Sequence, residues 1–179
     1  MTKKITLGGG CFWCTEAVFQ RLKGVEHVES GYMGGSLPNP TYRDICTGNS
    51  GHAEIIQITY DPAVISLEQL FEVFWTAHDP TTLNRQGADK GTQYRSVIFY
   101  GDEAEKAIAQ KSINEVASQL YSDPIVTELA PLTTYYPGEA YHQNYYNGQS
   151  SKPYCHVVIT PKIGKLRSKF TGLMKEEYL

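Results

Sequence analysis

The chain has 179 residues, of which 41% are hydrophobic and 20% are charged, with 16 Lys and Arg against 19 Asp and Glu. This length suits a hydrophobic core of ordinary size, and we expect residues 1–179 to form a single domain. The apolar fraction excludes a disordered chain, a mean hydropathy of −0.36 excludes a membrane protein, and a net charge of −3 argues against a nucleic-acid partner.

The N-terminal region lacks the features of a secretory signal. Its apolar run before Gly8 is only Ile5–Leu7, whereas a signal needs roughly 7–15 apolar residues. No stretch approaches the roughly 20 apolar residues of a membrane helix. We therefore expect a cytoplasmic protein with no membrane partner. Thiols stay reduced in that compartment, so its four cysteines are expected to be catalytic, metal-bound or buried rather than structural disulfides.

A glycine run separates the first expected strand from the first expected helix. Ile5–Leu7 predicts a strand that runs into Gly8–Gly10, and Cys11–Leu22 predicts a helix. Val25–Tyr32 is the second expected strand. Gly34–Gly51 is rich in Gly, Pro, Asn and Ser, and it predicts a loop.

The clearest strand pattern covers Glu54–Tyr60. Ile56, Ile58 and Tyr60 fall on one face of such a strand, and polar residues alternate with them. Glu54 has the same parity as these apolar residues. Its side chain is therefore expected to point to the apolar side.

A capping box marks the beginning of the next expected helix. Ser66 is followed three positions later by Gln69, and an apolar face then continues to Trp75. Asp79–Gly91 is an expected polar loop. Tyr94–Tyr100 carries apolar residues on both faces, which is typical of a central strand.

The remaining elements are a long helix, a strand and a terminal helix. Asp102 caps the long helix, which is expected to end near Tyr121, and Ile125–Leu129 predicts a strand. The last third is rich in loops and tyrosines, and we expect it to wrap over the rest of the molecule. A basic helix is expected over Ile163–Met174.

From Ile5 to Tyr100 the expected order is strand, helix, strand, strand, helix, strand. This order is that of the split βαβ motif. We therefore predict an α+β fold, a two-layer sandwich with a ferredoxin-like βαββαβ core and a loop-rich C-terminal wrap.

Cys11 and Cys14 are the clearest candidates for chemistry. They lie three positions apart at an expected helix start, which places both sulfurs on one face. Unpaired N–H groups and a partial positive charge at a helix N-terminus stabilise a thiolate, and such sites lower a thiol pKa from about 8.5 to ~3.5–7.5. Both residues could instead be small buried side chains. The position after a glycine run favours a reactive pair.

A proton donor is needed if the thiolate attacks a group whose oxygen must leave. Glu54 is the candidate, since burial would raise its carboxyl pKa and keep it protonated. The pattern alone leaves open that Glu54 bends to solvent. Tyr42 and Tyr94 are candidate hydroxyl donors, although either could simply pack in the interior.

Phe12 and Trp13 flank Cys11 and are candidates for the wall of an apolar subsite, with plain core packing as the alternative. A structural zinc site is a rival interpretation of the Cys pair, with Cys46, His52, Cys155 and His156 as potential partners. Cys46 and Cys155 lie too far apart in sequence to form the usual second half-site.

The chain departs from three other known motifs. His52-Ala53-Glu54 matches the His-x-Glu of zinc deaminases, but in those enzymes the Cys pair follows the His-x-Glu and here it precedes it. Gly8–Gly10 is not followed by the Gly-Lys-Ser/Thr of a phosphate loop. A thioredoxin-like enzyme would place the Cys pair in a βαβ unit of a parallel sheet.

Several sequence blocks, spread over nearly the whole chain, resemble those of the A-type peptide methionine sulfoxide reductases. The blocks, in chain order, are Gly9-Gly10-Cys11-Phe12-Trp13, Gly31-Tyr32-Met33-Gly34-Gly35, Asn39-Pro40-Thr41-Tyr42, Cys46-Thr47-Gly48, Gly51-His52-Ala53-Glu54, His78-Asp79-Pro80-Thr81, Asn84-Arg85-Gln86-Gly87, Gly91-Thr92-Gln93-Tyr94-Arg95-Ser96, Tyr136-Pro137-Gly138-Glu139-Ala140-Tyr141-His142-Gln143 and Tyr154-Cys155.

The resemblance implies an enzyme that reduces the S epimer of methionine sulfoxide, free or in oxidised peptides and proteins, to methionine. Cys11 would attack the sulfoxide sulfur and become a sulfenic acid, and Glu54 would protonate the sulfoxide oxygen. The remaining implied roles are oxygen binding by Tyr42 and Tyr94, positioning of substrate and water by Asp89, and methyl binding by Phe12 and Trp13. The family's two-layer α+β sandwich agrees with the expected element order.

The resemblance also implies a reductant and leaves out other groups. Electrons would come from thioredoxin through a disulfide, and neither a metal nor a bound cofactor is implied. A monomer is the expected state.

The chain departs from the commonest family pattern at Cys14. Many relatives have Gly there and carry resolving cysteines in a glycine-rich C-terminal tail, whereas no Cys follows Cys155 in this chain. On this comparison Cys14 is the expected resolving thiol, in a Cys11–Cys14 disulfide. Cys155 is the alternative, and Cys46 is expected to be structural.

Overall fold

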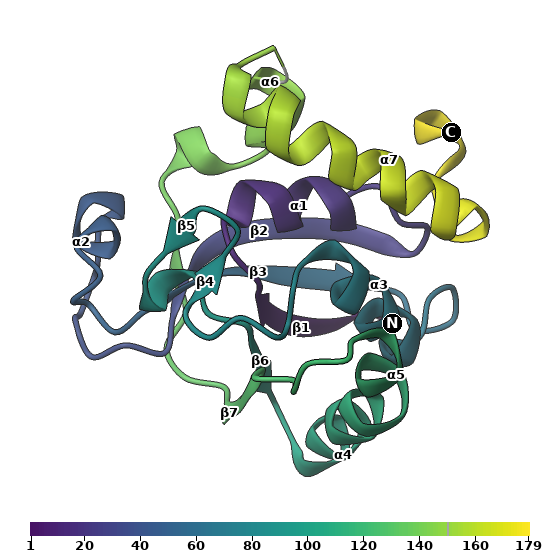
Figure 1. The fold of residues 1–179 in the computed structure, drawn as a ribbon, viewed down its shortest axis with the longest axis horizontal. Coiled ribbons are helices and arrows are strands. Elements are labelled where there is room, and N and C mark those ends of the chain that lie inside the picture. The colour runs from purple at the N-terminus through teal and green to yellow at the C-terminus, as the bar shows by residue number, and fades with distance from the viewer. Residues whose placement is uncertain (150) are drawn as a thin grey trace.

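A six-stranded mixed sheet forms the centre of this computed structural model, which describes residues 1–149 and 151–179 (Figure 1). The strand order is β7-β6-β1-β3-β2-β8. Neighbouring strands are antiparallel except for β6 and β7, which run parallel. The strands of this sheet are β1 (Lys3–Gly8), β2 (Val25–Met33), β3 (Ala53–Tyr60), β6 (Val97–Tyr100), β7 (Glu128–Pro131) and β8 (Tyr136–Pro137).

Helices cover one face of the sheet, and α7 lies across α1 on the outside (Figure 1). The helices are α1 (Phe12–Phe19), α2 (Tyr42–Cys46), α3 (Leu67–Ala77), α4 (Glu103–Ser112), α5 (Ser118–Leu120), α6 (Tyr145–Gln149) and α7 (Thr160–Lys169). π-helical turns at Ile113–Ala117 and Cys155–Ile159 lead into α5 and α7. The predicted combination of helices and strands around a central sheet is confirmed.

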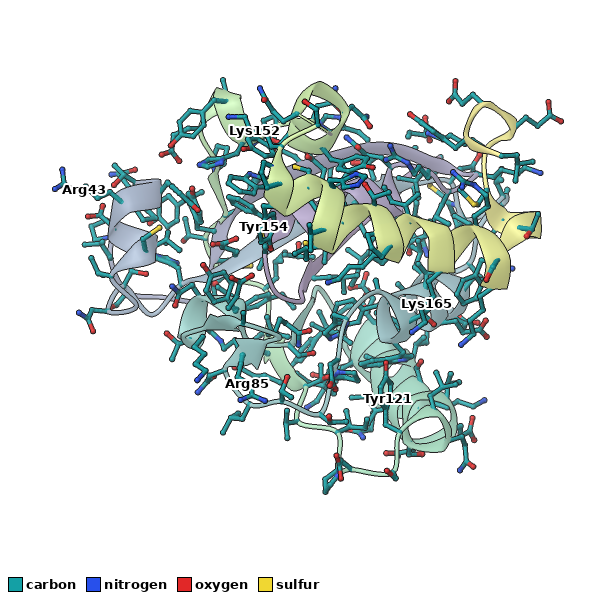
Figure 2. The ribbon with its side chains drawn as sticks, turned by 45° about the horizontal axis from the view of Figure 1, so that its top comes forward. Arg43, Arg85, Tyr121, Lys152, Tyr154 and Lys165 are labelled. Atoms are coloured by element: carbon teal, nitrogen blue, oxygen red, sulfur yellow. The ribbon has the colours of Figure 1, made fainter. Side chains whose placement is uncertain are left out.

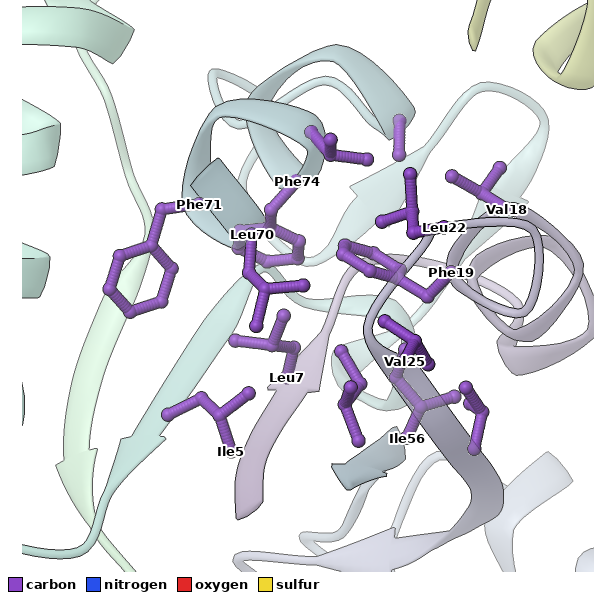
Figure 3. Close-up of a cluster of buried hydrophobic side chains, with 14 of the residues drawn as sticks. Ile5, Leu7, Val18, Phe19, Leu22, Val25, Ile56, Leu70, Phe71 and Phe74 are labelled. Atoms are coloured by element: carbon purple, nitrogen blue, oxygen red, sulfur yellow. The ribbon is translucent and has the colours of Figure 1, made fainter. Parts of the chain in front are cut away.

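The main core lies between this sheet face and helices α1 and α3 (Figure 3). Leu7 from β1, Ile56 from β3, Phe19 from α1 and Phe74 from α3 are fully buried in it. Full burial of one such side chain contributes roughly 1.5–3 kcal/mol. The predicted apolar face of β3 is confirmed, because Ile56 and its partners of the same parity all lie in this core.

The capping box at the start of α3 is present as predicted. The Ser66 hydroxyl accepts a hydrogen bond from the Gln69 N–H at 3.1 Å, and the Gln69 side chain accepts one from the Ser66 N–H at 3.0 Å. Asp102 likewise caps α4 by accepting from the Glu105 N–H at 2.8 Å. Reciprocal side-chain contacts of this kind satisfy backbone donors that a helix start would leave unpaired.

The expected loop at Gly34–Gly51 contains a helix, α2, so this part of the prediction was wrong. A second capping box opens it: the Thr41 hydroxyl accepts from the Asp44 N–H at 3.2 Å, and Asp44 accepts from the Thr41 N–H at 2.9 Å. The polar, Gly- and Pro-rich surroundings hid a helix of only five residues.

Other boundaries differ from the prediction for local reasons. The first helix ends at Phe19 rather than at Leu22. The central strand begins at Val97, because Thr92–Tyr94 forms a 3₁₀ turn before it. Asp79–Gly91 holds a short hairpin of β4 (Arg85–Gln86) and β5 (Asp89–Lys90) rather than a plain loop.

The C-terminal part is more helical than the predicted wrap, since it contains α6 and α7. The last helix covers Thr160–Lys169, which begins and ends earlier than the expected Ile163–Met174. Within the described residues, no helix has the length and apolar character required to cross a membrane.

Candidate active site

Cys11 lies at the N-cap of α1, directly after the glycine run. Gly10 adopts a φ of +90°, and a Cβ added there would lie 2.8 Å from the Cγ of Gln86 in β4. The chain therefore makes its turn into α1 with a residue that needs both the left-handed backbone and the space. This turn leaves the Cys11 side chain half-buried at the beginning of the helix.

Glu54 is buried directly beside the first turn of α1. Its side chain is 2% exposed, and its Oε1 accepts a hydrogen bond from the Phe12 N–H at 3.1 Å. Burial raises the pKa of Glu54 to about 8, and the nearby Asp89 and Cys14 add to this effect. The carboxyl group is therefore protonated near neutral pH. This places Glu54 on the apolar side of β3, as its parity predicts.

The thiols of Cys11 and Cys14 are within hydrogen-bonding reach of each other. Burial, the hydrogen bond with Cys14 and the charge of Glu54 raise the pKa of Cys11. The hydrogen bond from Cys11 lowers the pKa of Cys14 to about 7, with Lys162 and Tyr154 acting in the same direction. The pair can therefore lose one proton easily and holds the second tightly.

An aromatic cluster adjoins Cys11 on the side of Phe12 and Trp13. The Phe12 ring lies 6.3 Å from the Tyr42 ring and 5.1 Å from His142, between ring centroids. Trp13 stacks on Tyr145 at 3.9 Å, and its Nε1–H donates to His142 Nδ1 at 3.0 Å. The predicted Phe12, Trp13 and Tyr42 thus come together in one apolar wall.

Glu139 fixes the position of Tyr42 in this wall. Its carboxylate accepts from the Tyr42 N–H at 2.9 Å and from the Tyr32 hydroxyl at 2.8 Å. Glu139 and His142 were not among the predicted site residues. Their block, Tyr136 to Gln143, was recognised from the sequence, but nothing local indicated that it meets Tyr42.

Tyr42 and Tyr94 lie close enough to Glu54 for its charge to act on both phenols. Burial raises the pKa of each phenol, and the charge of Glu54 raises it further. Both groups therefore keep their protons and can donate hydrogen bonds. Tyr94 lies in the 3₁₀ turn before β6, and Tyr42 is the first residue of α2.

On the other side of the thiols, Asp89 and Tyr154 approach Cys14. The Tyr154 hydroxyl donates to Asp89 Oδ2 at 3.0 Å and lies 3.6 Å from Cys14 Sγ. The three residues line a cavity of about 490 Å³ that Cys11 and Lys162 also border. Figure 2 shows Tyr154 in the segment that leads into α7, with Lys165 of the cavity wall farther along this helix. Tyr154 was not among the predicted site residues.

The two remaining cysteines have different surroundings. Cys155 is fully buried and packs with Cys14, Ala17 and Ile159, in a cluster that Cys11 borders. Cys46 is exposed at the end of α2. All four cysteines are free thiols.

The His52 ring contacts the backbone of the loop at residues 35–37. Its Nδ1 accepts from the Gly35 N–H at 3.0 Å, and its Nε2 lies 2.7 Å from the Leu37 carbonyl oxygen. Across residues 1–149 and 151–179, no three His, Cys, Asp or Glu side chains are grouped so that they could hold a metal ion. The zinc-site alternative is not supported.

Glu16 is a second buried carboxyl group, on α1 and away from the thiols. It accepts hydrogen bonds from the Asn144 N–H at 2.9 Å and the Tyr145 N–H at 3.2 Å, and burial raises its pKa to about 7. This contact ties the beginning of α6 to α1. The sequence pattern did not reveal it.

Comparison with known proteins gives concordant results. The family described as "Peptide methionine sulfoxide reductase" matches residues 3–173. A relative from Polynucleobacter asymbioticus, named "Peptide methionine sulfoxide reductase MsrA", is 49% identical over 177 residues, which cover 98% of this chain and 93% of the relative.

Solved structures show the same likeness. Reduced Mxr1 from Saccharomyces cerevisiae superposes with a TM-score of 0.79 at 36% identity, covering 86% of this chain and 89% of Mxr1. Mxr1 in complex with Trx2 superposes with a TM-score of 0.56 at 28% identity, covering 80% of this chain and 84% of that one.

Proposed function

This chain belongs to the peptide methionine sulfoxide reductase family and is an MsrA-type methionine sulfoxide reductase, and we propose that Cys11 and Glu54 carry out its reaction. The observation that carries this proposal is the protonated carboxyl group of Glu54 beside the thiol at the N-cap of α1. A nucleophile and a proton donor are thus held against the same small volume, as reduction of a sulfoxide requires.

The first step transfers oxygen from the substrate to the enzyme. The Cys11 sulfur attacks the sulfoxide sulfur while Glu54 protonates the sulfoxide oxygen. The oxygen then leaves with Cys11 as a sulfenic acid, methionine is released, and the thiol's proton returns to Glu54. The substrate sulfur gains two electrons and the Cys11 sulfur loses two.

The surrounding side chains orient the sulfoxide. Tyr42 and Tyr94 keep their phenol protons and lie close to Glu54, so they are placed to donate hydrogen bonds to the oxygen. Phe12 and Trp13 form the apolar wall that receives the methyl group. Asp89, on the cavity next to Cys11, positions the substrate and water. This asymmetric arrangement selects the S epimer, in free methionine sulfoxide or in an oxidised polypeptide.

The second step forms a disulfide that thioredoxin reduces. Cys14 is the resolving thiol, because its sulfur lies within hydrogen-bonding reach of Cys11. Cys155 packs against Cys14 in the same cluster and is the alternative resolver. Thioredoxin as reductant is supported by the solved complex of the related Mxr1 with Trx2.

A turnover without reductant tests both steps. The reduced enzyme is mixed with the S or the R epimer of a sulfoxide peptide, and methionine, remaining thiols and disulfide position are measured by mass spectrometry. We expect methionine and a Cys11–Cys14 disulfide from the S epimer only. Cys11→Ser should produce no methionine. Cys14→Ser should produce one equivalent of methionine per chain and no more, even when thioredoxin is added as the reductant. Sustained thioredoxin-driven turnover by Cys14→Ser contradicts the assignment of Cys14.

The same proposal covers the organisation of the molecule. Residues 1–179 act as one domain, which the continuous core from Ile5 to Met174 supports. Its centre is ferredoxin-like, because the strand order β6-β1-β3-β2 with antiparallel neighbours fits the split βαβ motif. Four free thiols suit a reducing, cytoplasmic location. Size-exclusion chromatography with light scattering tests the expected monomer.

A further inference from the structure

The Tyr154 hydroxyl lies between an acid and a thiol and has only one proton to give. Asp89 Oδ2, 3.0 Å away, is an acceptor, so the Tyr154 O–H donates to it. The Tyr154 oxygen then offers its lone pairs to Cys14 Sγ at 3.6 Å. The hydrogen bonds therefore run in one direction, from the Cys14 S–H to the Tyr154 oxygen and from the Tyr154 O–H to Asp89.

We propose that Tyr154 and Asp89 form a proton relay that deprotonates Cys14 when this thiol attacks the Cys11 sulfenic acid. The proposal rests on the assignment of Cys14 as the resolving thiol. When both protons shift along the chain, the two hydrogen bonds persist with reversed donors. Cys14 becomes a thiolate that accepts from Tyr154, and Asp89 becomes a carboxylic acid.

The relay balances the disulfide-forming step. The Cys14 sulfur bonds to the Cys11 sulfur, and the S–O bond of Cys11 breaks. Hydroxide leaves and takes a proton from Glu54 to become water. The Cys14 proton passes through Tyr154 to Asp89, which borders the cavity and releases a proton to solvent, and Glu54 takes up one proton from solvent in exchange. The Cys11 sulfur is reduced from sulfenic acid to disulfide, and the Cys14 sulfur is oxidised from thiol to disulfide.

Other groups that face Cys14 are consistent with this role. The hydrogen bond with Cys11 lowers the pKa of Cys14, and so do Lys162 on α7 and the contact with Tyr154. The negative charge of Asp89 raises the pKa of Cys14. Protonation of Asp89 in the relay removes this charge. Further titratable groups near Cys14 are Glu54 on β3 and Cys155 in the π-helical turn. His78, Asp79, Tyr121 and Lys165 line the cavity, and Tyr145 and Tyr146 pack on the cluster that contains Cys14.

Tyr154→Phe isolates the hydroxyl, because it keeps the ring that packs against Trp13 at 6.1 Å. Single-turnover reactions at saturating sulfoxide are quenched at intervals, and methionine release, sulfenic acid and disulfide are measured separately. In the variant we expect the sulfenic acid to accumulate and disulfide formation to be about 10²- to 10⁴-fold slower than wild type near pH 6, the usual contribution of general-base catalysis. The deficit should shrink to about 2-fold near pH 9, where even an ordinary thiol ionises without help.

Asp89→Asn tests the terminal acceptor, since an amide cannot take the proton. At saturating sulfoxide it should show the same pH-dependent accumulation of sulfenic acid. Tyr146→Phe is the matched control, because it removes a hydroxyl that contacts Thr160 at 2.7 Å in the same C-terminal region. It should form the disulfide at the wild-type rate at every pH.

Two results would overturn the relay and are distinguishable from each other. If wild type forms the Cys11–Cys14 disulfide and Tyr154→Phe forms it equally fast, or with a deficit that does not change with pH, the relay alone is wrong. If mass spectrometry finds the wild-type disulfide elsewhere, the assignment of Cys14 fails and the relay fails with it.

Discussion

Glu54 holds a proton at neutral pH because its carboxyl group is enclosed between β3 and α1, with one backbone N–H as a hydrogen-bond partner. One such bond is too little to offset the cost of burying a charge. The same enclosure would make a glutamate a poor structural residue. It makes a suitable acid for an oxygen that must be protonated during reduction.

Glu54→Gln tests this acid role at the residue scale. The amide keeps the shape and can still accept from Phe12, but it has no proton of suitable acidity. We expect kcat to fall about 10²- to 10⁴-fold, with Cys11 still alkylated by iodoacetamide. In wild type, kcat should decline above about pH 8 as Glu54 ionises, and the variant should lose this alkaline limb. Glu29→Gln on β2 is the control, and its kcat and pH profile should match those of wild type. An unchanged pH profile in Glu54→Gln would contradict the assignment of Glu54 as the acid.

At the scale of elements, the turn from β1 into α1 decides where Cys11, the proposed nucleophile, lies. The turn depends on Gly10, whose left-handed φ and contact with Gln86 leave no room for a side chain. The hairpin β4–β5, which contributes Gln86, also carries Asp89 to the opposite end of the site. One short hairpin therefore supports both the nucleophile and the acceptor near Cys14.

Gly10→Ala is expected to destabilise the fold by about 1–2 kcal/mol, the cost of a left-handed backbone, with additional strain from Gln86. It should also reduce kcat, because Cys11 shifts relative to Glu54. Gly164→Ala in α7 is the matched substitution, since no atom lies within 4 Å of its added Cβ and alanine is the better helix former by about 0.5–1 kcal/mol. Urea unfolding measures both; equal stability of wild type and Gly10→Ala would contradict the strain argument.

Local patterns made some of these elements predictable and left others hidden. The inward direction of Glu54 follows from the alternation of its strand, and the start of α3 follows from Ser66 and Gln69. Helix α2 had an equivalent signal in Thr41 and Asp44, but its five residues give no helical periodicity. Tyr154 lies 140 positions from Cys14. Such a contact depends on how α7 packs over α1, which periodicity in one segment does not encode.

At the scale of the whole molecule, two buried carboxyl groups make stability depend on pH. The pKa of Glu54 is raised to about 8 and that of Glu16 to about 7, whereas an unfolded glutamate has a pKa of about 4.3. The unfolded state therefore binds fewer protons between these values. The contribution of these two groups to the free energy of unfolding is greatest below about pH 4.3. It falls as the pH rises through 7 and 8.

Thermal unfolding from about pH 5 to pH 9 tests this linkage. The Tm of wild type should fall toward alkaline pH, and Glu54→Gln should remove part of this decline. The Tm of the variant should therefore rise relative to that of wild type as the pH rises. Glu16→Gln should act at lower pH and alter amide exchange at Asn144 and Tyr145, whose N–H groups Glu16 accepts. If the Tm difference between wild type and Glu54→Gln does not change with pH, Glu54 is ionised in the folded protein.

The spacing of Cys11 and Cys14 within one helical turn also bears on survival under oxidative attack. A sulfenic acid that waits for a distant thiol is exposed to peroxide, which converts it irreversibly to sulfinic acid. A partner already in contact reacts as though at very high local concentration, and the intermediate is short-lived. With Cys14 as the proposed resolving thiol, we therefore expect the enzyme to keep its proposed nucleophile, Cys11, active in the presence of peroxide.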